Sequence, residues 1–480
     1  MDDTTLQAGA ARRTINPPLG IGKIGGRLFG DPIQWIESDL TATALVLTGA
    51  GTKVAIVAAD LCTVESRHAD TLRGDVGDTI GVPPSHVLFN ESHDHSAPAL
   101  PSYYPDWYES EFKEAYLTTL RRRIVEAAAE ADGRLQPARI GCGWGESTIG
   151  VYRRETRDGR DVLGEVPDHP IDPSVGVIRV DDLDGNPIAV AFRYSAHPVT
   201  VGSRSQVASA DYPGPAREVL ERNLGGLALF LQGCGGNINP RVGIGYEVDC
   251  RDTKNRVGLE LGGEALKIAA GIRTNTRAGR RRPLGNVPNI LFTPWEPVHG
   301  DTCTHLAAAE TTVALDYVDL PTLAEARATL EQWHAMVEEG RAGRTKEWEL
   351  RVAVKMEAWA RRLVAAVEAG GATFDLELQA IRVNDIVLAG MNVETFFETG
   401  LEIRARSPLP DTFVLGYTNG SMAYLPRADD HPEGGWKLGE RYALPDQIPQ
   451  FYPGQVSALH PESEQRALEG ALAEIRRLTR

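Results

Sequence analysis

The sequence predicts an α/β protein built around a mixed sheet, as a single domain with a helical insertion. Short apolar runs alternate with amphipathic segments from the start to about residue 315. A long helix-forming stretch follows, and strand-like chain resumes near residue 373. The chain has 480 residues, of which 42% are hydrophobic and 24% charged. These values are ordinary for a soluble globular protein and allow a large core.

The expected core strands are nearly continuous apolar runs rich in Val, Ile, Ala and Phe. They cover residues 52–64, 86–89, 186–196 and 226–233. Such runs are typical of strands that are buried on both faces of an α/β sheet. Amphipathic helices are expected between them, over residues 106–131, 213–223 and 255–274. The alternation of strands and helices favours an α/β architecture.

The second part of the chain predicts an insertion. Residues 275–300 are rich in Pro, Gly and Arg, and we expect irregular surface there. Residues 321–370 start with Pro, are rich in Ala, Leu, Glu and Arg, and end near Gly-Gly, which predicts a pair of helices. Strands are expected again over 373–397 and 412–426, and a helix closes the chain. Because strands return, we predict one domain over residues 1–480 with a helical insert at about 318–372.

Charge and cysteine content exclude several classes of protein. The net charge of −16 disfavours nucleic acid and acidic lipid as partners. The sequence shows no secretory signal and no apolar run of about 18 residues. The five cysteines are scattered without CxxC spacing, which argues against a disulfide framework and a thiolate metal site. We expect a cytoplasmic protein without stable membrane association, and the composition leaves a homo-oligomer open.

Three histidines stand at the ends of expected core strands. His93 and His95 follow the run 86–89. Side chains two apart on a strand face the same side, so this pair can bind a metal such as Zn²⁺ or simply form hydrogen bonds at a strand end. His197 follows the run 186–196 and is either a ligand or a capping residue. The recurrence favours a pocket at the sheet edge, where α/β proteins bind ligands.

Carboxylates and a cysteine occur at comparable places. Asp60 and Glu394 stand near strand ends, and Asp211 precedes a helix, where capping is a strong alternative to a site role. Glu394 is costly to bury unless it is paired or bound to metal. Cys234 lies in the glycine-rich run 231–240, and it is either a nucleophile or, as its surroundings favour, a packing residue.

In this order, these motifs resemble the neutral/alkaline (non-lysosomal) ceramidase superfamily. The resemblance runs over most of the chain through "ESHDHSAPA", "VYRRE", "SAHPVTVG", "ASADYPGPAREVLE", "QGCGGNINP", "GMNVETFFETG" and "YTNGSMAYLP". It implies a catalytic domain of that type and one catalytic Zn²⁺ per chain. The implied metal ligands are His93, His197, Glu394 and Tyr424.

The resemblance also implies roles for residues around the metal. His95 would be a neighbouring active-site histidine, and Arg153 matches the family's active-site arginine, with Arg154 as the alternative. Asn239 stands where the family has a catalytic serine. An amide side chain cannot act as a serine-type nucleophile, so we expect attack by metal-activated water. Two further departures are Asn237 in place of Asp and Asp94 in place of Thr.

The expected function is therefore zinc-dependent hydrolysis of a linear amide bond. The sequence matches neither the signal peptide nor the C-terminal β-sandwich of lipid-degrading members, so we expect a small polar N-acyl substrate rather than ceramide. The alternatives are an ester or lactone substrate at the same site, or an inactive member that binds ligands. Asp60, Asp211 and His95 remain candidates for the proton shuttle, and Mn²⁺ or Fe²⁺ remain alternatives to zinc.

Overall fold

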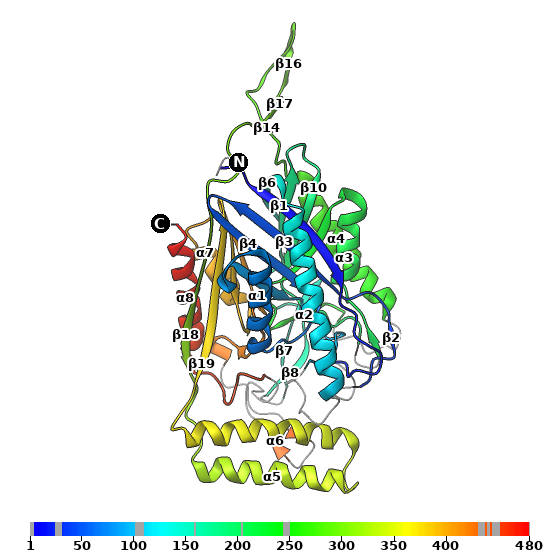
Figure 1. The fold of residues 1–480 in the computed structure, drawn as a ribbon, viewed down its shortest axis with the longest axis vertical. Helices are drawn as coiled ribbons and strands as arrows, with labels where there is room; N and C mark the ends of the chain where they lie inside the picture. The colour runs from blue at the N-terminus through cyan, green and yellow to red at the C-terminus, as the bar shows by residue number, and fades with distance from the viewer. Residues whose placement is uncertain are drawn as a thin grey trace.

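A computed structural model describes residues 4–24, 31–100, 110–157, 160–202, 205–242, 250–430, 437–438, 442–443 and 452–479. Two β-sheets pack face to face and helices cover their outer faces (Figure 1). The predicted α/β class with a mixed sheet is confirmed. Within the described ranges, no helix has both the length and the apolar character needed to cross a membrane.

The larger sheet has eight strands in the order β12-β10-β9-β6-β1-β3-β4-β5. These are β1 (Gln7–Thr14), β3 (Thr41–Gly49), β4 (Thr52–Ala59), β5 (Val87–Glu91), β6 (Gln136–Glu146), β9 (Ser174–Asp182), β10 (Pro187–Tyr194) and β12 (Leu227–Gln232). Neighbours run antiparallel except β4·β5 and β10·β12, the two edge pairs. Asn90 of β5 accepts a hydrogen bond from the backbone N–H of Gln232 in β12 at 2.8 Å. The sheet is therefore curved so strongly that its edges approach each other.

The smaller sheet has the order β18-β19-β20-β22. Its strands are β18 (Leu306–Asp316), β19 (Thr373–Val383), β20 (Ile386–Met391) and β22 (Asp411–Leu415). Between the two sheets, Leu45, Ile56 and Leu88 pack in one buried cluster with Leu388 and Phe413. Because apolar burial is the main stabilising term in folding, this layer fixes how the two sheets sit on each other.

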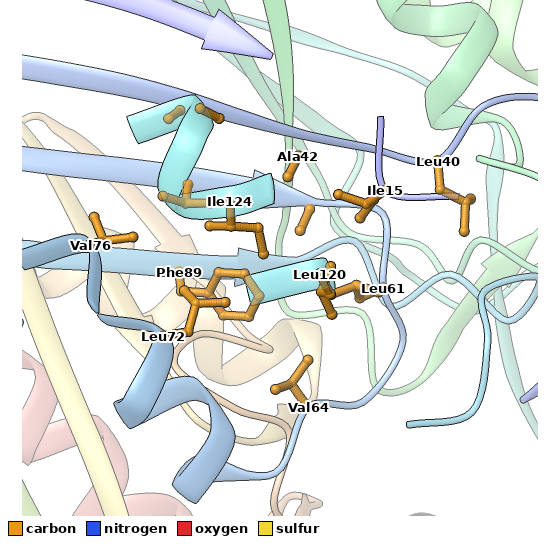
Figure 2. Close-up of a cluster of buried hydrophobic side chains, with 14 of the residues drawn as sticks. Ile15, Leu40, Ala42, Leu61, Val64, Leu72, Val76, Phe89, Leu120 and Ile124 are labelled. Carbon is orange, nitrogen blue, oxygen red and sulfur yellow. The ribbon is translucent and has the colours of Figure 1, made fainter. Parts of the chain in front are cut away.

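Helices bury the outer faces of both sheets. Over the larger sheet lie α1 (Ser66–Ile80), α2 (Ser110–Gly133), α3 (Pro213–Leu224) and α4 (Arg251–Gly271), and over the smaller one α7 (Phe397–Arg406) and α8 (Ser463–Arg477). Figure 2 shows the core under α1 and α2, where Leu72 and Val76 meet Leu120, Ile124 and Phe89. Strands outside the two main sheets include β2 (Trp35–Ile36), β7 (Gly150–Arg157), β8 (Arg160–Val166), β11 (Val207–Ala208), β13 (Ile238–Pro240), β21 (Glu394–Thr395), β23 (Tyr424–Leu425), β24 (Lys437–Leu438) and β25 (Tyr442–Ala443).

The predicted helical pair is present as α5 (Leu323–Arg341) and α6 (Glu347–Glu368), between β18 and β19. The pair extends from one end of the molecule and has its own core around Trp333 and Trp359 (Figure 1). A capping box of Thr322 and Glu325 starts α5. That the whole chain forms one domain stays a prediction.

Residues 275–300 differ from the prediction of irregular surface. They form β14 (Thr276–Ala278), β15 (Arg282–Leu284), β16 (Val287–Phe292) and β17 (Trp295–Pro297), paired as two antiparallel ribbons. The reason is the two-residue turn Gly285-Asn286, in which Gly285 has φ 54°. Such turns match the twist of a hairpin, and the surrounding Pro and Arg residues hid this signal.

We predict that Leu120→Ala in α2 lowers the free energy of unfolding by about 2–5 kcal/mol, because it leaves a cavity in the cluster of Figure 2. The measurement is urea unfolding followed by circular dichroism. The matched control is Leu259→Ala, since Leu259 is 58% exposed and should change stability by no more than about 0.5 kcal/mol. Equal effects of the two substitutions would contradict the proposed packing.

Candidate functional site

The candidate site lies where several strands of both sheets end. His93 follows β5, His197 follows β10, and the loop around Gly235 follows β12. Glu394 opens β21 shortly after β20 of the smaller sheet. The curvature of the larger sheet and the packing of the smaller sheet against it therefore bring residues from distant parts of the sequence together.

His93, His197 and Glu394 form a buried group whose ligand atoms lie within 4.8 Å of one another. Nε2 of His197 is 3.0 Å from Glu394 Oε1, and Nε2 of His93 is 3.3 Å from Oε2. The structure thus brings together three of the residues that the family resemblance implies as metal ligands. Two imidazoles and a carboxylate are a donor set that suits Zn²⁺.

The other nitrogen of each histidine faces a backbone carbonyl. Nδ1 of His93 is 2.9 Å from the carbonyl oxygen of Cys62, and Nδ1 of His197 is 2.8 Å from that of Gly235. A hydrogen bond from Nδ1–H to a carbonyl leaves the Nε2 lone pair for a metal, which is the usual arrangement around metal-binding histidines. These residues therefore fit a metal ion.

The histidine pair is not held as the sequence predicted. His93 lies outside β5 and has φ 60°, a left-handed backbone conformation that is uncommon for a non-glycine residue. The argument that the two histidines share one face of a strand is therefore wrong. His95 nevertheless reaches the site, with its Nε2 3.3 Å from that of His93. Strained residues of this kind cluster at functional sites.

The Glu394 carboxylate is the common partner in this group. Arg153 donates to Oε1 at 2.8 Å and the Tyr452 hydroxyl donates to Oε2 at 2.6 Å. Burial alone would raise the pKa of Glu394, but His197 and His93 hold it well below its usual range. The carboxylate is therefore ionised, as a metal ligand must be.

Burial has the opposite effect on the neighbouring histidines. It lowers the pKa of His197 to about 4, and the positive charge of Arg153 adds to this effect. Burial also lowers the pKa of His95, and the nearby His93 and His197 lower it further. Both imidazoles are therefore neutral at neutral pH, so His197 can act as a ligand and His95 can exchange hydrogen bonds with a substrate.

Both candidate arginines reach the site from β7. A register shift between Tyr152 and Arg154 interrupts the pairing of β7 with β8. Successive side chains on a regular strand face opposite sides, and a bulge removes this restriction. Arg153 lies 2.8 Å from Glu394 and 3.5 Å from Oδ1 of Asn239, whereas Arg154 contacts the Tyr424 hydroxyl at 3.3 Å.

Tyr424 and Asn239 border the site. The backbone of Tyr424 pairs with Glu394 in the β21·β23 sheet, and its hydroxyl donates to the carbonyl of Gly236 at 3.2 Å. Whether Tyr424 also binds the metal stays a prediction. Asn237 holds the start of α7, because its Oδ1 accepts from the N–H of Phe397 and its amide donates to Glu398. The replacement of a family Asp by Asn237 is thus compatible with a structural role.

Two tyrosines of the site escaped the sequence analysis. The Tyr417 ring lies 4.3 Å from the His93 ring, and Tyr417 has φ 50°. It follows β22, so the strand-end criterion that selected the histidines could have found it. Tyr452 lies outside every expected element, and no pattern in the sequence marks it.

The remaining carboxylate candidates are engaged elsewhere. Asp60 forms a two-pronged ion pair with Arg217, at 2.6 and 2.7 Å, and also accepts from the backbone of Thr41. Asp211 accepts from the backbone N–H groups of Val201 and Tyr212, so it links the loop after His197 to the start of α3. These contacts favour structural roles for both carboxylates.

The cysteines near the site fit packing better than chemistry. Burial raises the pKa of the Cys234 thiol to about 12. Cys62, His93 and His95 form a second group with metal-binding spacing that shares His93 with the first. Burial raises the pKa of Cys62 well above its usual value, and nearby carboxylates including Asp94 raise it further. A thiol rather than a thiolate is a poor ligand, so the group with Glu394 fits a metal better.

Comparison with known proteins identifies similar sequences. Neutral ceramidase A of Dictyostelium discoideum is 24% identical over 273 residues, covering 53% of this chain and 38% of that protein. Neutral ceramidase of Pseudomonas aeruginosa is 26% identical over 198 residues, covering 38% of this chain and 29% of that protein. The matches thus span well under half of the length of these relatives. No protein-family model matches the sequence.

Solved structures share the fold. The crystal structure of neutral ceramidase from Pseudomonas aeruginosa superposes with a TM-score of 0.65 at 18% identity, covering 99% of this chain and 75% of that one. A ceramidase complexed with C2 superposes equally well, with a TM-score of 0.65 at 16% identity. The chain therefore shares its fold with the larger part of these ceramidase structures. The sequence matches and the shared fold together support membership of the neutral ceramidase superfamily.

We predict that Asp60→Asn lowers the free energy of unfolding by about 3–5 kcal/mol, because it leaves the Arg217 charge buried without its partner. Urea unfolding measures this loss. The control is Asp252→Asn, whose ion pair with Arg256 is exposed to solvent and should leave the stability close to that of the wild type. If Asp60→Asn kept wild-type stability but lost turnover, the structural role would be wrong and Asp60 would be assigned as the proton shuttle.

Proposed function

We propose that this chain is a zinc-dependent hydrolase that cleaves a linear amide bond in a small polar N-acyl substrate. The observation that carries this proposal is the convergence of the His93 and His197 Nε2 atoms on the two oxygens of Glu394. The similarity to proteins named neutral ceramidases supports hydrolysis of an amide.

A zinc ion held by His93, His197 and Glu394 would supply a Lewis acid for the reacting carbonyl and for water. The protein's own groups would hold the substrate. Arg153 keeps Glu394 in position through one nitrogen, while its Nε has no hydrogen-bond partner among the described residues. We propose that Arg153, which is 8% exposed, orients a substrate oxygen beside Glu394. Neutral His95, beside His93, can exchange hydrogen bonds with a substrate.

The tyrosines add hydrogen-bond donors. The Tyr417 hydroxyl is buried against the two histidines and has no partner within the described part of the chain. A buried donor left without an acceptor costs about 1–3 kcal/mol, which supports a substrate oxygen as its acceptor. Donors aimed at a developing oxyanion are typically worth roughly 3 kcal/mol each in catalysis.

The polar character of the site supports a polar substrate over a sphingolipid. Arg153 and Arg154 are both buried at its wall, and Tyr417, Tyr424 and Tyr452 bring three hydroxyls to it. We propose a small-molecule substrate, with neither nucleic acid nor a stable membrane contact as partner. The cytoplasmic location also stays a prediction.

We predict about one tightly bound zinc per chain in the purified protein, and its loss in His93→Ala and Glu394→Ala. Metal analysis by plasma mass spectrometry gives the stoichiometry. His305→Ala is the control, since His305 is exposed and should leave the zinc content unchanged. Wild-type protein without metal, or an unaltered metal content in His93→Ala, would contradict the proposed site.

We predict turnover of small N-acyl amines, and its loss after treatment with a chelator and restoration by added zinc. The assay compares N-acyl amines, esters, lactones and a short-chain ceramide under the same conditions. If the enzyme preferred an ester or a lactone, the proposed metal site would stand, but the assignment of an amide substrate would be wrong. Full metal occupancy without turnover of any compound would favour an inactive binding protein, which the replacement of a serine by Asn239 also suggests.

A further inference from the structure

The ribbons formed by β14 to β17 make a projection from the body of the protein, which we call the arm (residues 276–297). It extends away from the two sheets at the end opposite to α5 and α6 (Figure 1). At its base, Arg273 lies over the ring of Trp295, 4.0 Å from its centroid. Farther out, β15 and β16 pair around the turn at Gly285. The sequence therefore encodes a defined hairpin.

The arm exposes apolar side chains. Every residue from 280 to 291 is exposed. Leu284, Val287, Ile290 and Leu291 are 42–51% exposed, and Trp295 is 54% exposed. A two-stranded ribbon without a covering layer is marginally stable in water, and clustered exposed apolar side chains mark interaction sites. The arm thus has the features of a segment that packs against another surface.

The arm also carries positive charge in an acidic protein. Arg280, Arg281 and Arg282 are consecutive and exposed, and none of them pairs with a carboxylate of the described chain. The chain as a whole carries −16. The rest of the surface is therefore strongly acidic and complements the arm in charge.

We propose that the arm docks on the acidic surface of a second copy of this chain. Its apolar side chains would be covered there and its arginines would meet carboxylates. An anionic bilayer also attracts arginines, but it repels the acidic body that carries them. The body of a second copy carries the same net charge, but its surface offers the arm both carboxylates for its arginines and exposed apolar side chains for its own. Each copy has one arm, so reciprocal docking gives a closed, symmetric dimer.

Sedimentation velocity of the full chain, at concentrations up to roughly 100 μM, tests this proposal. We expect wild-type protein to sediment as a dimer. The double substitution Leu284→Asp with Leu291→Asp should weaken association about tenfold or more, because it places charge in the docked surface. Leu259→Asp on α4 is the matched control, since Leu259 is equally exposed but lies outside the arm. It should sediment like the wild type.

Charge reversal provides an independent measurement. Arg280→Glu, Arg281→Glu and Arg282→Glu combined should weaken the dimer, and raising the salt to about 0.5 M should weaken the wild-type dimer in the same direction. Unchanged thermal unfolding of the monomer would show that these variants fold. Wild-type protein that is monomeric throughout, or arm variants with wild-type association, would overturn the proposal. So would a monomer that binds phosphatidylglycerol vesicles through the arm.

Discussion

The buried carboxylate of Glu394 is the group on which the rest of the site depends. It is 2% exposed, and its two oxygens contact His93, His197, Arg153 and the Tyr452 hydroxyl. An ionised carboxylate in such a place would be strongly unfavourable without these partners. Each partner comes from a different part of the chain, so the requirement to compensate one negative charge brings four segments to the same point.

The helical insertion contributes to this arrangement through the chain that carries Tyr452. From α6, Trp359 donates to the carbonyl of Val456 at 2.8 Å and Arg362 donates to that of Tyr452 at 3.3 Å. Gln455 accepts from the backbone of Tyr424 at 3.0 Å. Residues 452–456 are thus held between α6 on one side and β23 on the other. A peripheral helix thereby influences where the Tyr452 hydroxyl lies.

The sequence allowed the α/β class, most long helices and the strands β4, β5, β10 and β12 to be predicted, because amphipathic helices and buried apolar runs have clear patterns. It marked His93, His197 and Glu394 as polar residues at strand ends, and the family resemblance implied their role as metal ligands. The strands β1, β3, β6, β9 and β18 were missed. The sequence could not predict the left-handed backbone of His93, since tertiary contacts impose it against the residue's own preference. Helix α1 was missed because Gly74 and Gly77 weaken its pattern. The partner of Asp60 was equally hidden, because Arg217 is distant in sequence and only the fold brings it near.

The division of the site between two sheets has a thermodynamic consequence. His93 and His197 follow strands of the larger sheet, whereas Glu394 follows β20 of the smaller one. A ligand that contacts all three can bind only when the sheets are assembled, and the unfolded chain offers no such group. Occupancy and folding are therefore linked equilibria, and each tenfold rise of free ligand above its dissociation constant adds about 1.4 kcal/mol to the stability of the assembled sheets.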